Sequence, residues 1–276
     1  MNPPLFLLYF SISLFFSSFA FLKLPSDDSE TQKKVSLFFP LLCALPIIFK
    51  GVISLFPKVE IYFFPIGLWS LVRNDFWLPF LILFFSLIIH RVQAKDRRIL
   101  KFLVVFLFLF SIQQTWRLLI PPEACNFNGK ILNGVCMQSS PYTCGAAAIV
   151  TLLNVFNIPA QEGEVSKLVD IIPRMGATAP QIAFGLDQKL RHSKPDLKVI
   201  LKTCNFEDLG SLPVPFLACI KYSTFYNHVI CVFNIGSSSA LVGDPLNGRM
   251  NFKLEKLQKA WLGIVICVQP RFNESK

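Results

Sequence analysis

The 276-residue sequence lacks the marks of several common protein classes. It has three histidines, and its eight cysteines form no C-x-x-C pair, so neither a structural zinc site nor another metal site is expected. No G-x-x-x-x-G-K-S/T loop occurs, so nothing supports ATP-driven export by this chain. Basic residues form no stripe interleaved with aromatic residues, which argues against a nucleic-acid partner.

Positive charge is also missing from the start of the chain. The segment MNPPLFLLYF precedes the first Lys or Arg, which favours a retained helix over a cleaved secretory signal. The chain nevertheless carries a net charge of +10, and its Lys and Arg concentrate between apolar runs. Loops of this kind face the anionic inner leaflet of a membrane.

Long apolar runs dominate residues 1–122. The sequence is 53% hydrophobic with 29 Phe, and four runs approach the roughly 20 apolar residues that cross a bilayer as a helix. These runs span 5–22, 35–56, 76–89 and 99–120. The stretch 57–75 is apolar but broken by proline, glycine and charge, so it is either an interfacial or re-entrant segment or a further crossing. We predict an all-α transmembrane region of about four helices, with five as the alternative.

The loop 90–101, HRVQAKDRRILK, sets the expected orientation. It holds five basic residues and one acidic residue, and such loops stay in the cytoplasm. With four helices, the last one then exits outward, and the rest of the chain lies on the periplasmic or extracellular face. A fifth crossing at 57–75 would place the lysine-bearing loops at 23–34 and 90–101 on opposite faces. The sequence therefore predicts a multi-pass membrane protein with the lipid bilayer as a partner.

The composition changes near residue 123, which marks a second predicted domain over 123–276. Apolar residues at helical spacing predict helices at 145–157, 162–172 and 179–190. Alternating, β-branched runs separated by Pro, Gly, Asn and Ser then predict strands. These runs are LKVILKT, VPFLACIKY, NHVICVFNIG, SALVGDP and GIVICVQ. Helices followed by strands indicate an α+β domain.

Cys144 stands at the start of the helix predicted over 145–157, and Gln138 lies six positions upstream. A thiol is a weak nucleophile at neutral pH, because it is mostly protonated. The positive end of a helix and a nearby imidazole both favour the reactive thiolate. Gly145 would leave room for a substrate backbone to come close. Taken alone, a cysteine in this position is more often a packed core residue.

A candidate imidazole comes from the three histidines. His90 borders the basic loop, and His192 lies in the turn-like sequence RHSKPD. His228 opens the apolar strand NHVICVFNI, so its ring would be held rigidly on a sheet. We therefore expect His228 to be the partner of the thiol.

Two further groups complete the arrangement. Asp244, in LVGDPLNG, follows a strand about one hairpin after His228, and adjacent antiparallel strands would place them side by side. Alone, Asp244 is a turn residue. The Cys144 backbone amide and the Gln138 side chain could donate hydrogen bonds to a developing oxyanion, each worth about 3 kcal/mol of barrier.

The motifs Q-x5-CGAAA, NHVICV, GDPLNG and AWLG, in this order, resemble the bacteriocin-processing C39 family of papain-like cysteine peptidases. The resemblance covers roughly residues 130–270. It implies a papain-like α+β peptidase domain with no cofactor. It also implies roles for Cys144 as nucleophile, His228 as general base and acid, Asp244 as the orienting group and Gln138 as oxyanion donor.

This chain departs from the family's best-known members in its order of parts. Those members carry the peptidase ahead of an ATP-driven exporter and cut leader peptides after a double glycine in the cytosol. Here the peptidase follows the helices. The resemblance leaves double-glycine cleavage and a separate transporter partner open.

The sequence therefore predicts a membrane-anchored cysteine peptidase that acts on a peptide or protein substrate. Two alternatives remain open. One is an amidase or transpeptidase of the same fold acting on envelope material, and the other is a non-catalytic peptide-binding membrane protein.

The remaining cysteines lead to two expectations. Cys125 and Cys136 flank NFNGKILNGV and either form a disulfide that closes this loop or stay as two free thiols. The other group falls on or beside apolar strands and is expected in the core: Cys204, Cys219, Cys231 and Cys267.

Overall fold

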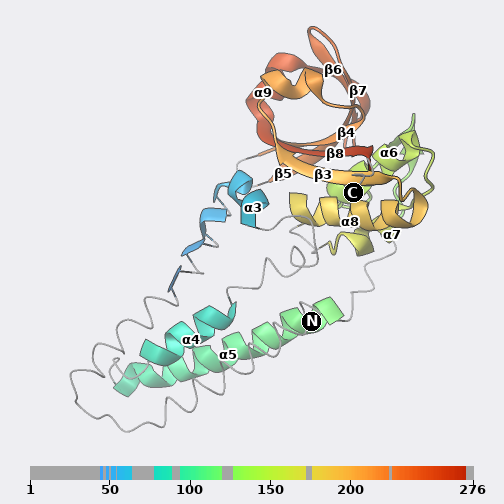
Figure 1. The fold of residues 1–276 in the computed structure, drawn as a ribbon. Helices are drawn as coiled ribbons and strands as arrows, with labels where there is room; N and C mark the ends of the chain where they lie inside the picture. Colours follow the sequence, from blue (N-terminus) through green and yellow to red (C-terminus); the bar gives the residue numbers. More distant parts are fainter. Residues whose placement is uncertain are drawn as a thin grey trace, which may run out of the picture. The chain divides into compact units, whose positions relative to one another are not determined.

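The computed structural model describes residues 44–45, 48–49, 51–53, 55–63, 78–88, 94–119, 127–171, 176–223 and 226–271. The chain divides into two compact units (Figure 1). The first comprises residues 1–56 and 72–120, and the second comprises residues 57–71 and 121–276. Part of the segment between two predicted membrane helices thus belongs to the second unit. The predicted domains, 1–122 and 123–276, stay a prediction.

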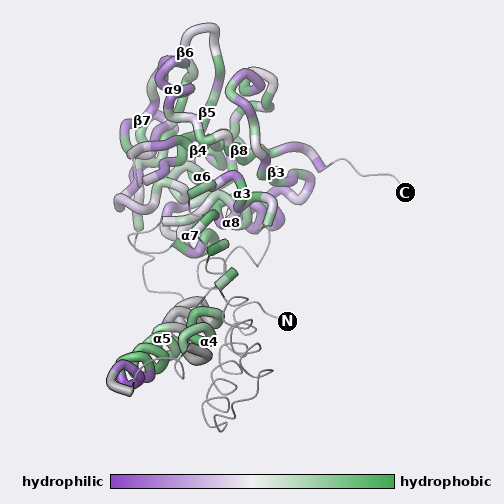
Figure 2. The backbone as a smooth tube through the Cα atoms, turned by 90° about the vertical axis from the view of Figure 1, so that its left-hand side faces the viewer, coloured by the Kyte–Doolittle hydropathy of each residue, from purple (hydrophilic) through white to green (hydrophobic). Residues whose placement is uncertain are grey.

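Two helices of the first unit contact each other: α4 (Leu78–Ile88) and α5 (Ala94–Leu119). They fall within the third and fourth predicted helices. Both are coloured mainly as hydrophobic in Figure 2, apart from the hydrophilic start of α5. Ile82 and Val104 are buried. Large apolar side chains of α5 are exposed: Ile99, Phe102, Val105, Phe106, Leu109 and Phe110.

The described helices do not meet the requirements of a bilayer crossing. Within the ranges given above, no helix combines the length and the apolar character that spanning a membrane needs. The helix predicted over 5–22 lies outside the described residues, and 35–56 is described only in short pieces. The transmembrane region is therefore not supported by the described helices.

A six-stranded antiparallel sheet forms the centre of the second unit. Its order is β3-β8-β4-β5-β6-β7, so β8, the last strand in sequence, lies between β3 and β4. The strands are β3 (Leu197–Thr203), β4 (Phe216–Lys221), β5 (Asn227–Ile235), β6 (Ser239–Asp244), β7 (Gly248–Lys253) and β8 (Trp261–Pro270). A short hairpin, β1 (Ile131–Leu132) with β2 (Val135–Cys136), forms a separate sheet.

Alternate residues of the central strands face two different cores, because side chains point to opposite faces of a sheet in turn. In β4, Leu217 and Cys219 face the core formed with the helices α6, α7 and α8, whereas Phe216 and Ala218 face the second core. β5 and β8 alternate in the same way. The apolar strands are therefore buried on both sides.

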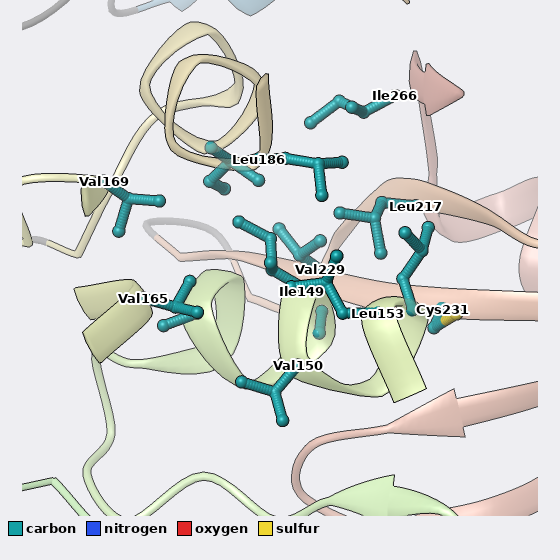
Figure 3. Close-up of a cluster of buried hydrophobic side chains, with 14 of the residues drawn as sticks. Ile149, Val150, Leu153, Val165, Val169, Leu186, Leu217, Val229, Cys231 and Ile266 are labelled. Carbon is teal, nitrogen blue, oxygen red and sulfur yellow. The ribbon is translucent and has the colours of Figure 1, made fainter. Parts of the chain in front are cut away.

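Three helices cover one face of the sheet: α6 (Cys144–Val155), α7 (Glu162–Leu168) and α8 (Ala179–Ser193). Figure 3 shows Ile149 and Leu153 of α6 among Leu217, Val229 and Cys231 of the strands. In Figure 1, α9 (Leu254–Ala260) lies with β6 and β7, away from these helices. Its Leu257 is buried in the second core.

The helices and strands predicted within residues 123–276 are confirmed, apart from shifts at their ends. The helix predicted over 162–172 ends at Leu168, because Asp170 adopts a left-handed backbone conformation with φ of 48°. β7 and α9 were not predicted from the sequence. Neither was α3 (Pro57–Phe63), which packs against β3, β8 and α8 and places Ile61 on the core.

The cysteine predictions have different outcomes. Cys204, Cys219, Cys231 and Cys267 are all buried in the two cores, as predicted. Cys136 is a free, buried thiol, so the disulfide alternative for Cys136 is wrong. Cys125 lies outside the described residues.

Candidate active site

Cys144 is the first residue of α6 and is half-buried. A turn precedes it, in which the Thr143 hydroxyl donates to the Ser140 carbonyl at 2.9 Å and accepts from the Ser140 amide at 3.2 Å. The first intrahelical bond runs from the Ala147 amide to the Thr143 carbonyl at 3.0 Å. The amides of the first turn therefore have no intrahelical acceptor. The positive end of the helix dipole lies at the sulfur.

His228 enters the site from the start of β5, and its side chain is buried. β5 pairs with β6 in an antiparallel register that matches Cys231 with Gly243. This pairing brings Asp244, at the end of β6, to the imidazole. The His228 Nε2 and the Asp244 Oδ1 are 2.7 Å apart. The predicted proximity of these two residues is therefore confirmed.

Cys144 is the second side chain that interacts with the imidazole, and this interaction contributes to the pKa of His228. Cys144 and His228 also line the same cleft. The ring thus links the sulfur on α6 to the carboxylate on β6. The three side chains expected to converge do so.

Opposing effects set the pKa of the His228 imidazole. Burial alone would lower it, because a charged ring loses hydration. The hydrogen bonds to Asp244 and Cys144, and the negative charges of both groups, outweigh burial and raise the pKa to about 9.

Asp244 is held in its ionised form by three donors. Burial would raise its pKa, but the His228 ring, the Asn247 side chain and the Leu246 amide lower it below the usual value. The Leu246 amide donates to Oδ1 at 2.8 Å, and the Asn247 Nδ2 donates to Oδ2 at 2.7 Å. The turn after β6 therefore fixes both carboxylate oxygens.

Gln138 lies on the loop between β2 and α6. Its backbone amide donates to the Pro245 carbonyl at 2.9 Å, which ties this loop to the turn that carries Asp244. Its side-chain Nε2 donates one proton to the Ser140 carbonyl at 2.8 Å. The second N–H of that amide remains for another acceptor.

A cleft of about 610 Å³ joins these groups. Gln138, Cys144 and His228 line it together with Tyr142, Tyr222 and Tyr226. Leu246 also lines this cleft, from the turn that holds Asp244. The catalytic candidates thus share one opening, which is large enough for several residues of an extended peptide.

Comparison with known proteins decides the family. The sequence profile described as the Peptidase C39 family matches residues 133–273, just over half of the chain. The chain belongs to the Peptidase C39 family. The predicted enzyme class, a cysteine peptidase, and the papain-like fold with a sheet and helices are thereby confirmed.

The chain is also similar to solved structures of peptidase domains. One is a double glycine motif protease from an AMS/PCAT transporter in complex with the leader peptide. It is 18% identical with a TM-score of 0.44, and the match covers 53% of this chain and 96% of that chain. Another is the peptidase domain of Streptococcus ComA, a bi-functional ABC transporter involved in quorum sensing. It is 18% identical with a TM-score of 0.43, and the match covers 50% of this chain and 98% of that chain. No curated protein is similar enough in sequence to count as a match.

Gly145 lies where α6 packs closely on α8. A Cβ at this position would lie 2.7 Å from the Ile182 Cδ1 on α8. The missing side chain therefore allows this close packing, and the space expected for a substrate backbone stays a prediction.

His192, the other described histidine, does not line this cleft. His192 is exposed in the last turn of α8, where its Nδ1 contacts the Gln188 carbonyl at 2.9 Å. His90 lies outside the described residues. Among the described residues, no group of three or more His, Cys, Asp or Glu side chains could hold a metal ion.

Three residues of the C39 domain site were missed by the sequence analysis. The Tyr222 ring lies 5.7 Å from the His228 ring, measured between centroids, at a tilt of 53°. Asn247 holds Asp244, and Glu162 holds the loop of Gln138. The motif GDPLNG contains Asn247 and could have identified it, whereas Glu162 gives no local signal.

Proposed function

We propose that this protein hydrolyses peptide bonds through a thioester, with Cys144 as nucleophile and His228 as general acid and base. Asp244 orients the imidazole, and Gln138 donates to the oxyanion. The observation that carries this proposal is the His228 ring, whose Nε2 lies 2.7 Å from the Asp244 Oδ1 and which lines the same cleft as Cys144.

In the proposed mechanism, the His228 ring, whose pKa is raised to about 9, takes the proton of the Cys144 thiol and forms a thiolate–imidazolium pair. The sulfur attacks the substrate carbonyl carbon, and the negative charge moves to the carbonyl oxygen. The Cys144 amide, at the free end of α6, and the second N–H of Gln138 donate to this oxygen. Donors that are already fixed in place need no reorganisation during the reaction.

Collapse of this intermediate breaks the bond to the leaving amine. His228 gives its proton to the amine nitrogen, and the acyl group stays on the sulfur as a thioester. The neutral imidazole then removes a proton from water, and the resulting hydroxide attacks the thioester. The product leaves with a free carboxylate, and the proton stays on His228.

The proposed substrate is a peptide or protein segment bound in extended form. Tyr222 and Tyr226 are exposed on the rim of the cleft and offer flat apolar surfaces to a peptide. A relative of similar domain structure is described as a double glycine motif protease. We include leader peptides with two glycines before the cleaved bond among the substrates to be tested. A separate transporter partner stays a prediction.

We also propose that the helical unit associates the enzyme with a lipid bilayer, with the peptidase domain of residues 123–276 on the outer face. The apolar runs in the sequence and the exposed apolar side chains of α5 support this proposal. The basic loop at 90–101 supports the orientation. Protease protection of residues 127–271 in sealed vesicles tests the side on which the domain lies.

Product analysis tests the proposed function. The purified full chain is incubated with a mixture of peptides that includes Gly-Gly leader sequences, and the products are identified by mass spectrometry. We expect products with a free carboxylate, and acid quenching should trap an acyl group on Cys144. Products with a new amide bond would indicate a transpeptidase, and peptides bound but left intact would indicate a non-catalytic binding protein. Either result contradicts the proposal.

The pH dependence of kcat/KM provides an independent prediction. His228 must be protonated to deliver a proton to the leaving amine, so activity should fall as pH rises through about 9. The Asp244→Asn variant replaces an anion by a neutral amide, which lowers the pKa of His228. The decrease of kcat/KM at alkaline pH should therefore begin closer to neutral pH in this variant.

A matched control separates this local effect from a general loss of negative charge. Asp208→Asn changes an exposed carboxylate in the short helix η3 (Glu207–Ser211), which does not line the cleft. Its alkaline limb should coincide with that of the unmodified protein. An alkaline limb that stays fixed in Asp244→Asn would contradict the assigned role of Asp244.

A further inference from the structure

Glu162 is a buried carboxylate that the proposed mechanism does not use. It is the first residue of α7, and its exposure is 1%. Its Oε1 accepts the backbone N–H of Ser139 at 2.9 Å. Its Oε2 has no hydrogen-bond donor among the described residues. Burying a carboxylate costs several kcal/mol unless its hydrogen bonds compensate, so its presence here needs an explanation.

The surroundings of Glu162 are tightly packed. A Cβ at Gly129 would lie 2.9 Å from both the Glu162 Oε2 and the Cys136 Sγ. Burial and the charge of Glu162 raise the pKa of the Cys136 thiol to about 12. The carboxylate is therefore close to β2, immediately before the Gln138 loop. A side chain in such a packed place has little freedom to move away from Ser139.

Four backbone hydrogen bonds fix the loop from Cys136 to Ser139, one of them from the Met137 amide to the Lys130 carbonyl at 2.9 Å. The Cys136 amide donates to the Thr151 hydroxyl on α6 at 2.9 Å. The Gln138 amide donates to the Pro245 carbonyl, as described above, and the Ser139 amide donates to Glu162. In these bonds, Glu162 provides the charged acceptor, and bonds to charged groups are shorter and stronger than neutral ones. It holds the amide that directly follows Gln138.

We propose that Glu162 is a positioning residue of the oxyanion site: its carboxylate holds the Ser139 amide and thereby fixes the Gln138 side chain beside Cys144. This inference rests on the proposed function. Loss of the carboxylate leaves the Ser139 N–H without its protein acceptor and lets the loop shift. A shift of about 1 Å in a group that contacts the reacting atoms is enough to cost up to 100-fold in rate.

Two small reagents separate this role from general damage to the site. The first is p-nitrophenyl acetate, which acylates Cys144: the sulfur forms a bond to the acetyl carbon, and p-nitrophenolate leaves. This reaction passes through an oxyanion. The second is iodoacetamide, which alkylates the same sulfur with loss of iodide and forms no oxyanion. The ratio of the acylation rate to the alkylation rate, measured on the full chain, reports on oxyanion stabilisation. The natural substrate need not be known for this measurement.

Four variants are compared after subtraction of the Cys144→Ala background. Glu162→Ala should lower the acylation rate about 10- to 100-fold and leave the alkylation rate within about twofold. Glu162→Gln keeps an oxygen acceptor for Ser139 and should recover most of the acylation rate. Glu164→Ala is the matched control, because Glu164 lies on the same helix but forms an ion pair with Lys189 (2.6 Å, Nζ to Oε1) at its exposed carboxylate. Its two rates should both be unchanged.

The fourth variant, Gln138→Ala, shows whether Glu162 acts through Gln138. If so, the double variant Gln138→Ala/Glu162→Ala should be acylated at a rate within about twofold of that of Gln138→Ala alone. Once the Gln138 side chain is gone, loss of the carboxylate that positions it should have no further effect. The inference is overturned if the fold losses in acylation rate of the two single variants multiply in the double variant. It is also overturned if Glu162→Ala leaves the ratio of acylation rate to alkylation rate unchanged. A Cys144→Ala background equal to the rate of the unmodified chain instead overturns the proposed function itself.

Discussion

The Cys144→Ala variant should cleave the best substrate of the peptide mixture about 10⁶-fold more slowly than the unmodified chain, because removal of a nucleophile leaves only the weak catalysis by binding and the oxyanion donors. The substitution removes one sulfur at the start of α6 and does not change the backbone bonds that place it. KM should change little, since the cleft around Gln138 and the tyrosines stays intact. The measurement is steady-state kinetics on the purified full chain.

Cys204→Ala is the matched control for this experiment. Its sulfur is buried in the second core and contacts its own neighbour, the Asn205 carbonyl, at 3.2 Å. Cleavage by this variant should stay within about twofold of the unmodified rate, because sites without shared contacts act independently. Full activity in Cys144→Ala would mean that another residue attacks the substrate.

The His228→Ala variant should lose about 10⁵- to 10⁶-fold in kcat, since loss of the base of a triad costs about as much as loss of its nucleophile. The imidazole takes the proton of the thiol and later gives a proton to the leaving amine. Its removal should also slow the alkylation of Cys144 by iodoacetamide. This second effect distinguishes His228 from Gln138, whose replacement should leave alkylation unchanged.

His192→Ala controls for loss of an imidazole elsewhere in the same domain. This ring is exposed at the end of α8 and contacts only a carbonyl of its own helix in the described structure. Both its kcat and its alkylation rate should match the unmodified chain. Alkylation at the normal rate in His228→Ala would contradict the thiolate–imidazolium pair.

Several parts of the domain could be predicted from the sequence because their patterns are local. The strand LKVILKT alternates, and NHVICVFNIG is a continuous apolar run bounded by polar residues, so both were recognised. The convergence of Cys144, His228 and Asp244 could also be expected, because two of them lie on successive strands of an antiparallel sheet. The order of these residues along the chain was sufficient to predict that they come together.

Other parts depend on contacts that no local pattern reveals. β7 lies at the edge of the sheet and carries partly exposed polar residues, so GRMNFK does not read as a strand. α3 has seven residues inside an apolar stretch, and only its packing on β3 and β8 identifies it as part of this domain. Glu162 resembles an ordinary acidic residue in the first turn of a helix. Its role depends on Ser139, which is distant in sequence.

The position of β8 in the middle of the sheet has a consequence for biosynthesis. During synthesis, Cys144 and His228 are made before β8. Until β8 is present, β3 and β4 have no strand between them to join them into one sheet. β4 pairs with β8 on one side and with β5, the strand that carries His228, on the other. Activity should therefore arise only after β8 has joined the sheet, and a chain that lacks β8 should not cleave peptides.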